Sequence, residues 1–221
     1  MPAPAPHGEV LVCFAVPPEA RPFRRAAPPG VSVLVTGMGA RRTRQALEPV
    51  LGGSRPLPRS ILTCGFAGGL DPRWQAGDVL FEAGPAFPLA ARLSQAGARP
   101  GRFQGVDRVA TTAADKRVLW ERTGADAVEM ESAVVHELAS ARGIPCATVR
   151  VISDAAGEDL PLDFNEFTGP DGDLSPWRLA AAVALRPWRV PRLIRFGRQT
   201  SEAASALGRV LARALGGPGV H

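Results

Sequence analysis

Short apolar runs and amphipathic stretches alternate along most of the chain. The apolar runs are rich in Val, Ile and Leu, as buried strands are, and they cover residues 9–16, 31–36, 60–64, 78–83, 103–111, 126–130 and 145–152. Three stretches between them repeat apolar residues at helical spacing and cover residues 40–51, 112–123 and 132–143. Strands that alternate with helices predict an α/β fold with a mainly parallel sheet.

Two of the helical stretches have matching end signals. Thr112, or its neighbour Thr111, suits the N-cap of the helix 112–123, and Gly124 follows its last residue. Gly143 closes the third stretch in the same way. These caps support helices at both places.

The chain divides into one large domain and two ends of different composition. Residues 1–8 are rich in Pro and Ala, and we expect a frayed lead there. Residues 9–176 hold all the predicted strands and form one domain. Residues 177–221 are expected to form an Arg-rich extension of two or three helices, interrupted at Pro187 and Pro191, that packs on the same domain.

Composition narrows the class of protein. The 221 residues are 45% hydrophobic, which suits one globular domain, and no apolar run reaches the about 18 residues that a membrane span needs. The first residues lack the basic start and apolar centre of a signal peptide. Cys13, Cys64 and Cys146 have no CxxC spacing, which predicts free thiols in a reducing, cytoplasmic compartment. The three histidines have no neighbours at ligand spacing, so we expect no metal site.

The net charge of +5 comes almost wholly from arginine, and Lys116 is the only lysine. Such arginine use is typical of a GC-rich genome, and no basic patch interleaved with aromatics indicates nucleic-acid binding. From Trp177 onward, however, the chain has eight arginines and one acid, Glu202. This extension is expected to cover the sheet with its arginines in solvent, which we favour, or to touch an anionic membrane surface.

Glycines and polar residues gather where the predicted strands end, which is where ligands bind in parallel α/β sheets. The five segments are 15–20, 36–40, 64–72, 128–132 and 151–159. The glycines of CGFAGG (64–69) either admit a ligand close to the backbone or form only a tight connection. In TGMGARR (36–42), Gly39, Arg41 and Arg42 offer a helix start to an anion, although solvated arginines are more common.

Several acids and one arginine are candidates for chemistry. Asp154 ends an apolar strand, as a turn former or as a partly buried acid that donates a proton. Arg150 lies inside the same strand and needs a carboxylate or another acceptor if it is buried. Glu19 follows two prolines and, taken singly, has the setting of a solvated loop residue. Of Glu129 and Glu131, one suits the surface of a strand, and the other suits a helix start that faces a ligand.

Three motifs in this order resemble the purine nucleoside phosphorylase and nucleosidase superfamily. They are GFAGGLDPRWQAGDVLF (65–81), AVEMES (127–132) and VRVISDAA (149–156), and the resemblance covers roughly residues 9–160. Within it, the chain is most similar to the methylthioadenosine/S-adenosylhomocysteine nucleosidase type. The resemblance implies a three-layer α/β/α sandwich around a twisted, mostly parallel mixed sheet. It also implies cleavage of the N-glycosidic bond of nucleosides with water or phosphate.

The resemblance assigns roles at the ends of two strands. Asp154 would be the general acid that protonates the purine at N7, and Ser153 would orient it. Glu131 would accept hydrogen bonds from the ribose hydroxyls, while Met130 would pack against the sugar. Glu129 has no implied role beyond a structural polar contact.

The remaining roles fall on the first, third and last strands. Glu19 lies where the hydrolytic members hold the glutamate that activates water. Arg150 matches an arginine near the sugar, and Gly65, Ala67 and Gly68 would line the binding site. Because bond cleavage builds positive charge on the sugar, three carboxyls in different environments suit this reaction. Water or inorganic phosphate is the co-substrate, and no metal or organic cofactor is implied.

The sequence departs from the family at several places. Phe66 stands where a small hydroxyl residue is common, so its ring would narrow the pocket. Val109, or alternatively Phe103, lies near the place of the aromatic that stacks on the base. The region from residue 177 onward resembles the C-terminal part of hopanoid-associated phosphorylase-like proteins, which act on a nucleoside attached to a polycyclic lipid.

We expect hydrolysis of a purine nucleoside, with a 5′-modified adenosine favoured. One alternative is phosphorolysis, including that of a hopanoid-linked adenosine, with phosphate bound by Gly39, Arg41 and Arg42. Another is a catalytically silent nucleoside-binding protein in which Phe66 blocks the nucleophile. The resemblance implies a homo-oligomer, with a dimer as the first expectation, and no nucleic-acid partner.

Overall fold

The computed structural model describes residues 10–54, 56–167 and 190–216. Its strands are β1 (Val10–Phe14), β2 (Val31–Val35), β3 (Ser60–Gly69), β4 (Val79–Ala83), β5 (Arg99–Pro100), β6 (Phe103–Gly105), β7 (Ala127–Glu129) and β8 (Cys146–Asp154). Its helices are α1 (Pro17–Arg24), α2 (Ala40–Gly52), α3 (Ala90–Gln95), α4 (Ala113–Thr123), α5 (Ser132–Ser140), the 3₁₀ turn η1 (Phe164–Phe167) and α7 (Val190–Gly216).

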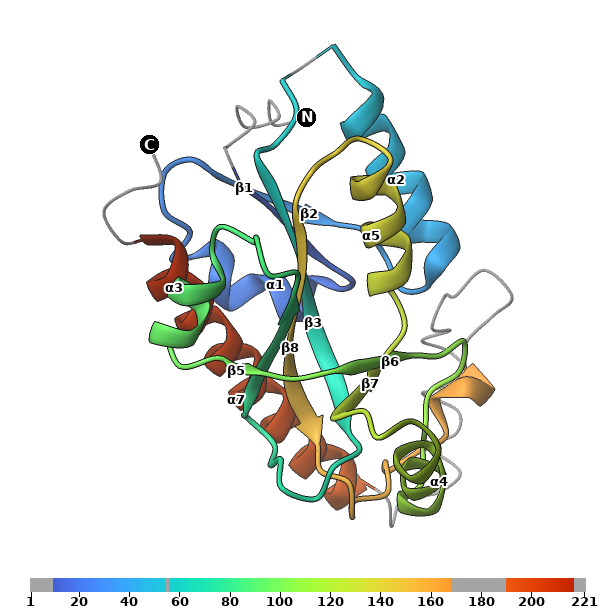
Figure 1. Ribbon diagram of the computed structural model, residues 1–221. Coiled ribbons are helices and arrows are strands. Elements are labelled where there is room, and N and C mark those ends of the chain that lie inside the picture. The colour runs from blue at the N-terminus through green and yellow to red at the C-terminus, as the bar shows by residue number, and fades with distance from the viewer. Residues whose placement is uncertain (1–9, 55, 168–189, 217–221) are drawn as a thin grey trace.

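One mixed sheet runs through the molecule in the order β2-β1-β3-β8-β4-β5 (Figure 1). β1 pairs in parallel with β2 and β3, and β3 pairs in parallel with β8. β4 runs antiparallel to β8 at the far side, while β7 pairs antiparallel with the end of β3 and carries β6. The α/β fold class with its mostly parallel mixed sheet is thereby confirmed.

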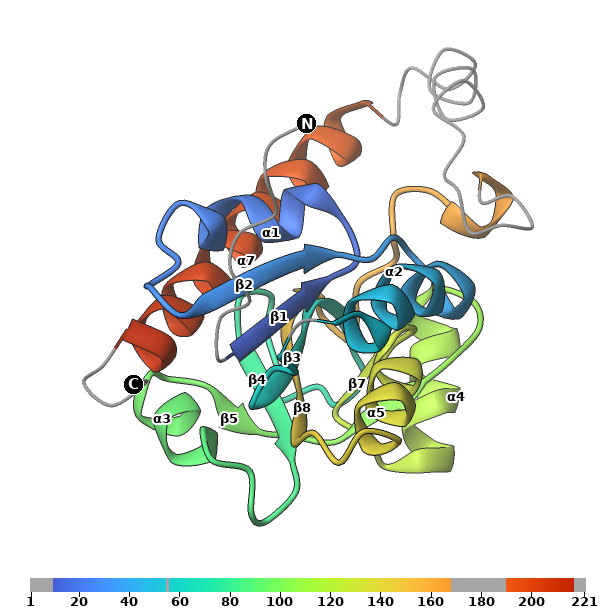
Figure 2. The ribbon, with the colours of Figure 1, turned by 90° about the horizontal axis from the view of Figure 1, so that it is seen from above.

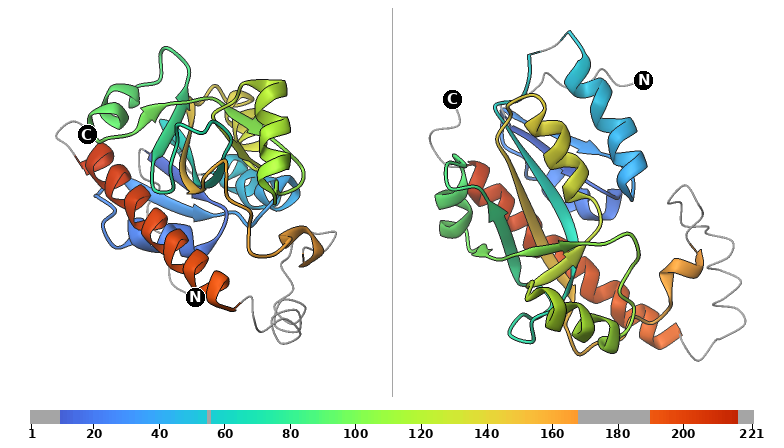
Figure 3. Two further views of the ribbon diagram at one scale, coloured as in Figure 1. Left: turned by 90° about the horizontal axis from the view of Figure 1, so that it is seen from below. Right: turned by 45° about the vertical axis from the view of Figure 1, so that its right-hand side comes forward.

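Helices cover both faces of the sheet (Figures 2 and 3). α2 and α5 pack together on one face, whereas α1, α3 and α7 lie on the other. The side chains of β1 alternate accordingly, because neighbouring residues of a strand point to opposite faces. Val12 and Phe14 join the core under α1 and α7, while Leu11 and Cys13 join the core under α2 and α5.

The long helix α7 lies diagonally across its face and contacts α1, α3 and β8 (Figure 3). Its buried residues are Ala203, Ala204, Leu207, Gly208, Leu211, Ala214 and Leu215. Pro191 is the second residue of α7, and the chain from Pro191 to Gly216 is one continuous helix. A proline is tolerated there, since the first turn of a helix has no intrahelical partner for its N–H. The expected break at Pro187, and Trp177, lie outside the described residues.

Three other sequence expectations are corrected by the structure. The strand expected over 103–111 ends at Gly105, and an irregular loop follows. The glycine-rich segment 64–69 is no connection, since β3 continues through it to Gly69. Glu19 belongs to helix α1 rather than to a loop, because Pro17 and Pro18 occupy the first turn of that helix.

No helix in residues 10–54, 56–167 or 190–216 combines the length and the apolar composition needed to cross a membrane.

Candidate functional site

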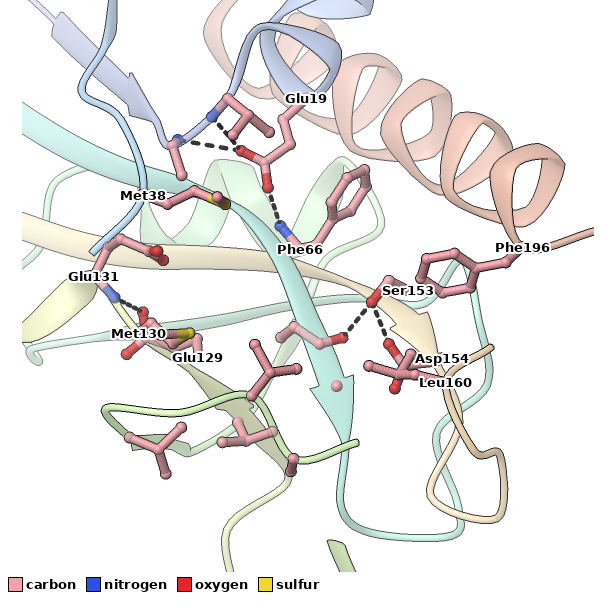
Figure 4. A pocket seen from close by; sticks show the side chains of 18 residues that line it. Glu19, Met38, Phe66, Glu129, Met130, Glu131, Ser153, Asp154, Leu160 and Phe196 are labelled. Atoms are coloured by element: carbon pink, nitrogen blue, oxygen red, sulfur yellow. Dashed lines mark hydrogen bonds between the residues drawn. The ribbon is translucent and has the colours of Figure 1, made fainter. Parts of the chain in front are cut away.

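A cavity of about 220 Å³ opens where β1, β3, β7 and β8 end (Figure 4). The predicted site residues that line it are Glu19, Phe66, Ala67, Gly68, Val109, Met130, Glu131, Ser153 and Asp154. These residues come from five separate parts of the chain: helix α1, strand β3, the loop after β6, the turn between β7 and α5, and the last two residues of β8. Arg150, Gly65, Gly39, Arg41 and Arg42 do not line the cavity.

Glu19 lies at one side of the cavity, where only 5% of the residue is exposed. Its Oε2 accepts hydrogen bonds from the backbone N–H groups of Ala15 and Val16, each at 3.1 Å, and its Oε1 accepts one from Phe66 at 2.9 Å. Burial raises the pKa of this carboxyl to about 7, although the N–H groups of Phe66 and Val16 oppose the rise. Glu19 therefore changes its charge near neutral pH, as a general base for water must.

Gly65 explains how the Glu19 carboxyl comes so close to β3. A Cβ at position 65 would lie 2.9 Å from Glu19 Oε1, which is closer than side-chain carbons are found. Gly65 therefore serves the site without lining it, because its missing side chain leaves the space for Glu19.

Glu131 faces the cavity from the N-terminus of α5. Its Oε1 accepts a hydrogen bond from the backbone N–H of Gly39 at 3.3 Å, and its Oε2 lies 3.8 Å from Arg150. Burial raises the pKa of Glu131 above its ordinary value; Arg150 opposes this rise and Glu129 adds to it. Met130 lines the same wall beside it.

Glu129, which also lines the cavity, forms a buried ion pair with Arg150 behind it, with Nη2 and Oε2 2.7 Å apart. Glu129 also accepts hydrogen bonds from the Ser132 hydroxyl at 2.5 Å and from the backbone N–H groups of Ser132 and Glu131. Burial would raise the pKa of Glu129, but Arg150 and Ser132 outweigh it and the pKa falls below its ordinary value. Glu129 is thus a fixed anion that anchors the start of α5 and holds Arg150 close to Glu131.

Asp154 lies at the opposite side of the cavity, at the end of β8. The pairing of β3 with β8 shifts between Ala67 and Gly68, so that Gly68 faces Asp154 and Ser153 has no partner. Such a bulge turns side chains out of the regular alternation. Here it brings the Ser153 hydroxyl to 2.5 Å from Asp154 Oδ1 and 3.2 Å from the Ala67 carbonyl.

The other oxygen of Asp154 is bound by Lys116 of α4, which sequence reasoning noted only as the single lysine. Lys116 Nζ lies 2.5 Å from Asp154 Oδ2, and its side chain is fully buried. The chain thus holds one lysine among 26 basic residues, and this lysine contacts the predicted general acid. That rarity was the only signal in the sequence, because the contact joins residues far apart in the chain.

Apolar side chains that the sequence analysis did not assign complete the cavity. They are Ala15, Val16, Met38, Val106, Ala110, Val128, Leu160 and Phe196. Phe196 arrives from α7, so the C-terminal helix contributes to the site and not only to the cover of the sheet (Figure 4). Of the two candidates for stacking on a base, Val109 lines the cavity and Phe103 packs in a core cluster with Ala67 and other buried residues.

The segment TGMGARR (36–42), which the sequence analysis offered as a phosphate site, lies beside the cavity. Only its Met38 lines the cavity. Gly37 and Gly39 have φ of 88° and 81°, values that favour glycine, and the N–H of Gly39 is bonded to Glu131. In the described part of the chain, no three His, Cys, Asp or Glu residues are grouped to hold a metal ion.

Comparisons with known proteins agree with one another. The model of the phosphorylase superfamily matches residues 96–172. A 5′-methylthioadenosine/S-adenosylhomocysteine nucleosidase of Treponema pallidum (strain Nichols) is 32% identical over 101 residues, which are 44% of this chain and 36% of the relative. An aminodeoxyfutalosine nucleosidase of Campylobacter jejuni is 39% identical over 69 residues, which are 31% of this chain and 30% of the relative. The matched regions thus span about a third of these curated relatives.

Solved structures resemble this one over nearly the whole chain. The 5′-methylthioadenosine/S-adenosylhomocysteine nucleosidase of Colwellia psychrerythraea 34H, solved in complex with adenine, has a TM-score of 0.67 and 16% identity, with 94% of each chain covered. The futalosine hydrolase of Helicobacter pylori strain 26695 has a TM-score of 0.66 and 16% identity, with 95% of this chain and 98% of that one covered. At such identity the likeness concerns the fold.

Proposed function

We propose that this chain hydrolyses the N-glycosidic bond of a purine nucleoside, because residues 96–172 match the phosphorylase superfamily model and 101 residues are 32% identical to a nucleosidase. The observation that carries the proposal is that Glu19, Glu131 and Asp154 line one cavity in three different environments. Breaking this bond requires a proton for the leaving base, negative charge near the sugar and a base for water. Each of the three carboxyls suits one of these tasks.

Asp154 would give its proton to N7 of the purine, with its Oδ1 held by Ser153. The electron pair of the C1′–N9 bond would pass into the purine ring, and the neutral base would leave. Asp154 is supported in this role by its place at the cavity wall and by the apolar side chains of Leu160 and Phe196 around it.

Glu131 would bind the ribose hydroxyls, with Met130 against the sugar. Its distance of 3.8 Å from Arg150 supports this role, because a carboxylate held by a neighbouring cation keeps a fixed direction. Its negative charge would also stabilise the positive charge that develops on the sugar.

Glu19 would take a proton from the attacking water. Its pKa of about 7 supports this role, since a base works best when its pKa lies near the working pH. Hydrolysis is favoured over phosphorolysis because the N–H of Gly39, the donor expected for phosphate, is bonded to Glu131. The substrate we favour is an adenosine with an apolar 5′ substituent, for which Phe66 and Phe196 offer a suitable wall.

The test is to incubate the protein with a panel of nucleosides, with and without phosphate, and to measure free base by chromatography. The panel contains adenosine, inosine, methylthioadenosine, S-adenosylhomocysteine, uridine and a lipid-linked adenosine. Purine release in phosphate-free buffer is the expected result. Release only with phosphate would replace hydrolysis by phosphorolysis, and no release of any base would leave a silent binding protein.

Asp154→Asn tests the assignment within the same assay. We expect turnover of the best purine nucleoside to fall about 10²-fold or more, because the amide has no acidic proton to give. Asp107→Asn, on an exposed residue of the loop after β6, is the matched control and should keep full turnover. Unchanged turnover in Asp154→Asn would remove Asp154 from the mechanism.

A further inference from the structure

Lys116 has a complete set of partners inside the protein. Its Nζ lies 2.5 Å from Asp154 Oδ2, 2.9 Å from the carbonyl of Ala155 and 2.8 Å from the carbonyl of Glu158. An ammonium group has three N–H donors, and here each of them has one acceptor.

This pair lies in an unusual place for an ion pair kept only for stability. Lys116 is buried completely, yet its partner Asp154 lines the cavity. A planar guanidinium would not satisfy two carbonyls and a carboxylate around one point, which accounts for a lysine in a chain that otherwise uses arginine.

We propose that Lys116 is a positioning residue for the reaction, which holds the Asp154 carboxyl at the cavity wall and stabilises the carboxylate left behind when Asp154 gives up its proton. This inference rests on the proposed function, since it concerns the same general acid. Lys116 does not line the cavity, so it acts on the substrate only through Asp154.

The step balances with the water of the proposed hydrolysis, whose oxygen bonds to C1′ while its proton passes to Glu19. The O–H bond of Asp154 breaks, an N–H bond forms at N7, and the C1′–N9 bond breaks with its electrons moving to the purine. Asp154 becomes a carboxylate, whose negative charge is met at once by the ammonium of Lys116. This attraction is absent while Asp154 is neutral, so it lowers the energy of the transition state more than that of the ground state.

Ser153 fits both states of Asp154. Its hydroxyl has one hydrogen and lies near two acceptors, Asp154 Oδ1 and the Ala67 carbonyl. When Asp154 is charged, Ser153 donates to Oδ1. When Oδ1 carries the proton, Asp154 donates to Ser153, which then donates to Ala67. The contacts of Lys116 stay the same in both states.

The other charged groups around Asp154 are exposed or are bound to other partners. From α7, Arg192 and Arg195 line an adjoining hollow with Asp154, and both are exposed. On the loop after β8, Glu158 accepts hydrogen bonds from the N–H of Ala155 and from Gln199, while Asp159 accepts one from the N–H of Ala113. Strand β3 presents only glycines 68 and 69 to Asp154. Lys116 is therefore the charge that acts on it directly.

The test compares two substrates in Lys116→Met. One is the best purine nucleoside of the panel, whose base needs a proton to leave. The other is p-nitrophenyl β-D-ribofuranoside, whose nitrophenolate leaves without one. We expect kcat for the purine nucleoside to fall at least about tenfold while kcat for the nitrophenyl riboside stays within about twofold of the wild type. An equal loss on both substrates would overturn the proposal.

Two further variants keep the test decisive if Lys116→Met folds poorly. The first is the double variant Asp154→Asn with Lys116→Met, in which neither member of the buried pair carries a charge. It should turn over the purine nucleoside at the same rate as Asp154→Asn alone. A further loss of about tenfold would overturn the proposal. Arg117→Met, which removes an exposed charge from the same helix, should behave as the wild type throughout.

The failure of the proposed function looks different from the failure of this inference. If the wild type cleaves no nucleoside, both fall together. If the wild type cleaves purine nucleosides and leaves the nitrophenyl riboside intact, the comparison of Asp154→Asn with the double variant decides alone.

Discussion

At the scale of single residues, the carboxyls of the cavity differ in pKa because their surroundings differ. Glu129 meets Arg150 and stays charged, whereas Glu19 meets only backbone N–H groups and keeps a raised pKa of about 7. Both are buried to a similar degree, so the direct ion pair with Arg150 and the hydrogen bonds from Ser132 distinguish Glu129 from Glu19. The environment of each carboxyl, rather than its residue type, thus distinguishes a fixed anion from a base.

Glu19 should make the stability of the protein depend on pH. Its pKa in the fold is about 7 against an ordinary value of 4.5, so the unfolded chain loses this proton first as the pH rises. The stability that the neutral carboxyl contributes is full below pH 4.5 and is lost by the time the pH has passed about 7. Between pH 5 and pH 8, the free energy of unfolding of the wild type should fall by about 2 to 3 kcal/mol relative to that of Glu19→Gln. Urea unfolding at both pH values measures this difference.

The same variant has a kinetic outcome. Hydrolysis by the wild type should rise with pH through about 7 as Glu19 becomes charged, and Glu19→Gln should abolish hydrolysis. Glu121→Gln, on an exposed residue of α4, is the control for both measurements and should change neither. Water-dependent cleavage at the wild-type rate in Glu19→Gln would exclude Glu19 as the base.

At the scale of elements, strand β3 is both a central strand of the sheet and rich in glycine at its end, a combination that is uncommon. It lies between β1 and β8 in the middle of the sheet, and its last residues are rich in glycine. Glycine weakens a strand, but side chains at these positions would collide with site residues. A Cβ at Gly68 would lie 3.2 Å from Val128 and 3.3 Å from Asp154 Oδ2.

Gly65→Ala should therefore lower turnover without a large loss of stability. The added Cβ meets the end of a flexible side chain, the Glu19 carboxyl, which can move aside but then loses its position for water. We expect kcat to fall by about tenfold or more, since displacement of a catalytic group by about 1 Å costs up to 10²-fold. The melting temperature and the steady-state kinetics together check this. Gly84→Ala, where the new Cβ meets nothing within 4 Å, should keep both values.

The sequence predicted the order of most strands and helices because alternating apolar runs carry that information locally. It missed the nature of two elements for definite reasons. The segment 64–69 looked like a loop because glycine disfavours strands, and only the neighbouring Glu19 and Asp154 explain its glycines. Helix α1 was missed because two prolines suggested a solvated loop, although they suit the first turn of a helix.

The site itself was predictable only as far as the resemblance reached. Glu19, Glu131 and Asp154 were chosen by their motifs, and all three line the cavity. Lys116 and Phe196 were not chosen, because their approach depends on how α4 and α7 pack against the ends of the strands. Periodicity along a chain does not encode such long-range contacts.

At the scale of the whole molecule, α7 connects the end of the described chain to its beginning. It packs against α1, the helix that carries Glu19, and sends Phe196 into the cavity. Gly208 lets the two helices approach closely, since a Cβ there would lie 3.0 Å from Pro22 Cβ and 3.1 Å from the backbone N of Phe23. The position of Glu19 therefore depends on a helix far away in the sequence.

Gly208→Ala should destabilise the protein although alanine is the better helix former. The gain in helix propensity is about 1 kcal/mol, whereas overlap with backbone in a packed core typically costs about 1 to 3 kcal/mol. Gly197→Ala lies on the same helix in open space, so it should gain up to about 1 kcal/mol instead. Chemical denaturation of both variants measures the contrast, and equal effects would show that the α1–α7 contact is loose.

The order of strands in the sheet also has a consequence for synthesis on the ribosome. β3 lies between β1, which precedes it, and β8, which is made much later, so the centre of the sheet stays half-paired until Cys146–Asp154 has emerged. Until then the apolar edge of β3 is open to pairing with other nascent chains, and such long-range closure is slow. Chaperone dependence should consequently be greatest for translation intermediates that end between β3 and β8, and should fall once α7 has left the exit tunnel.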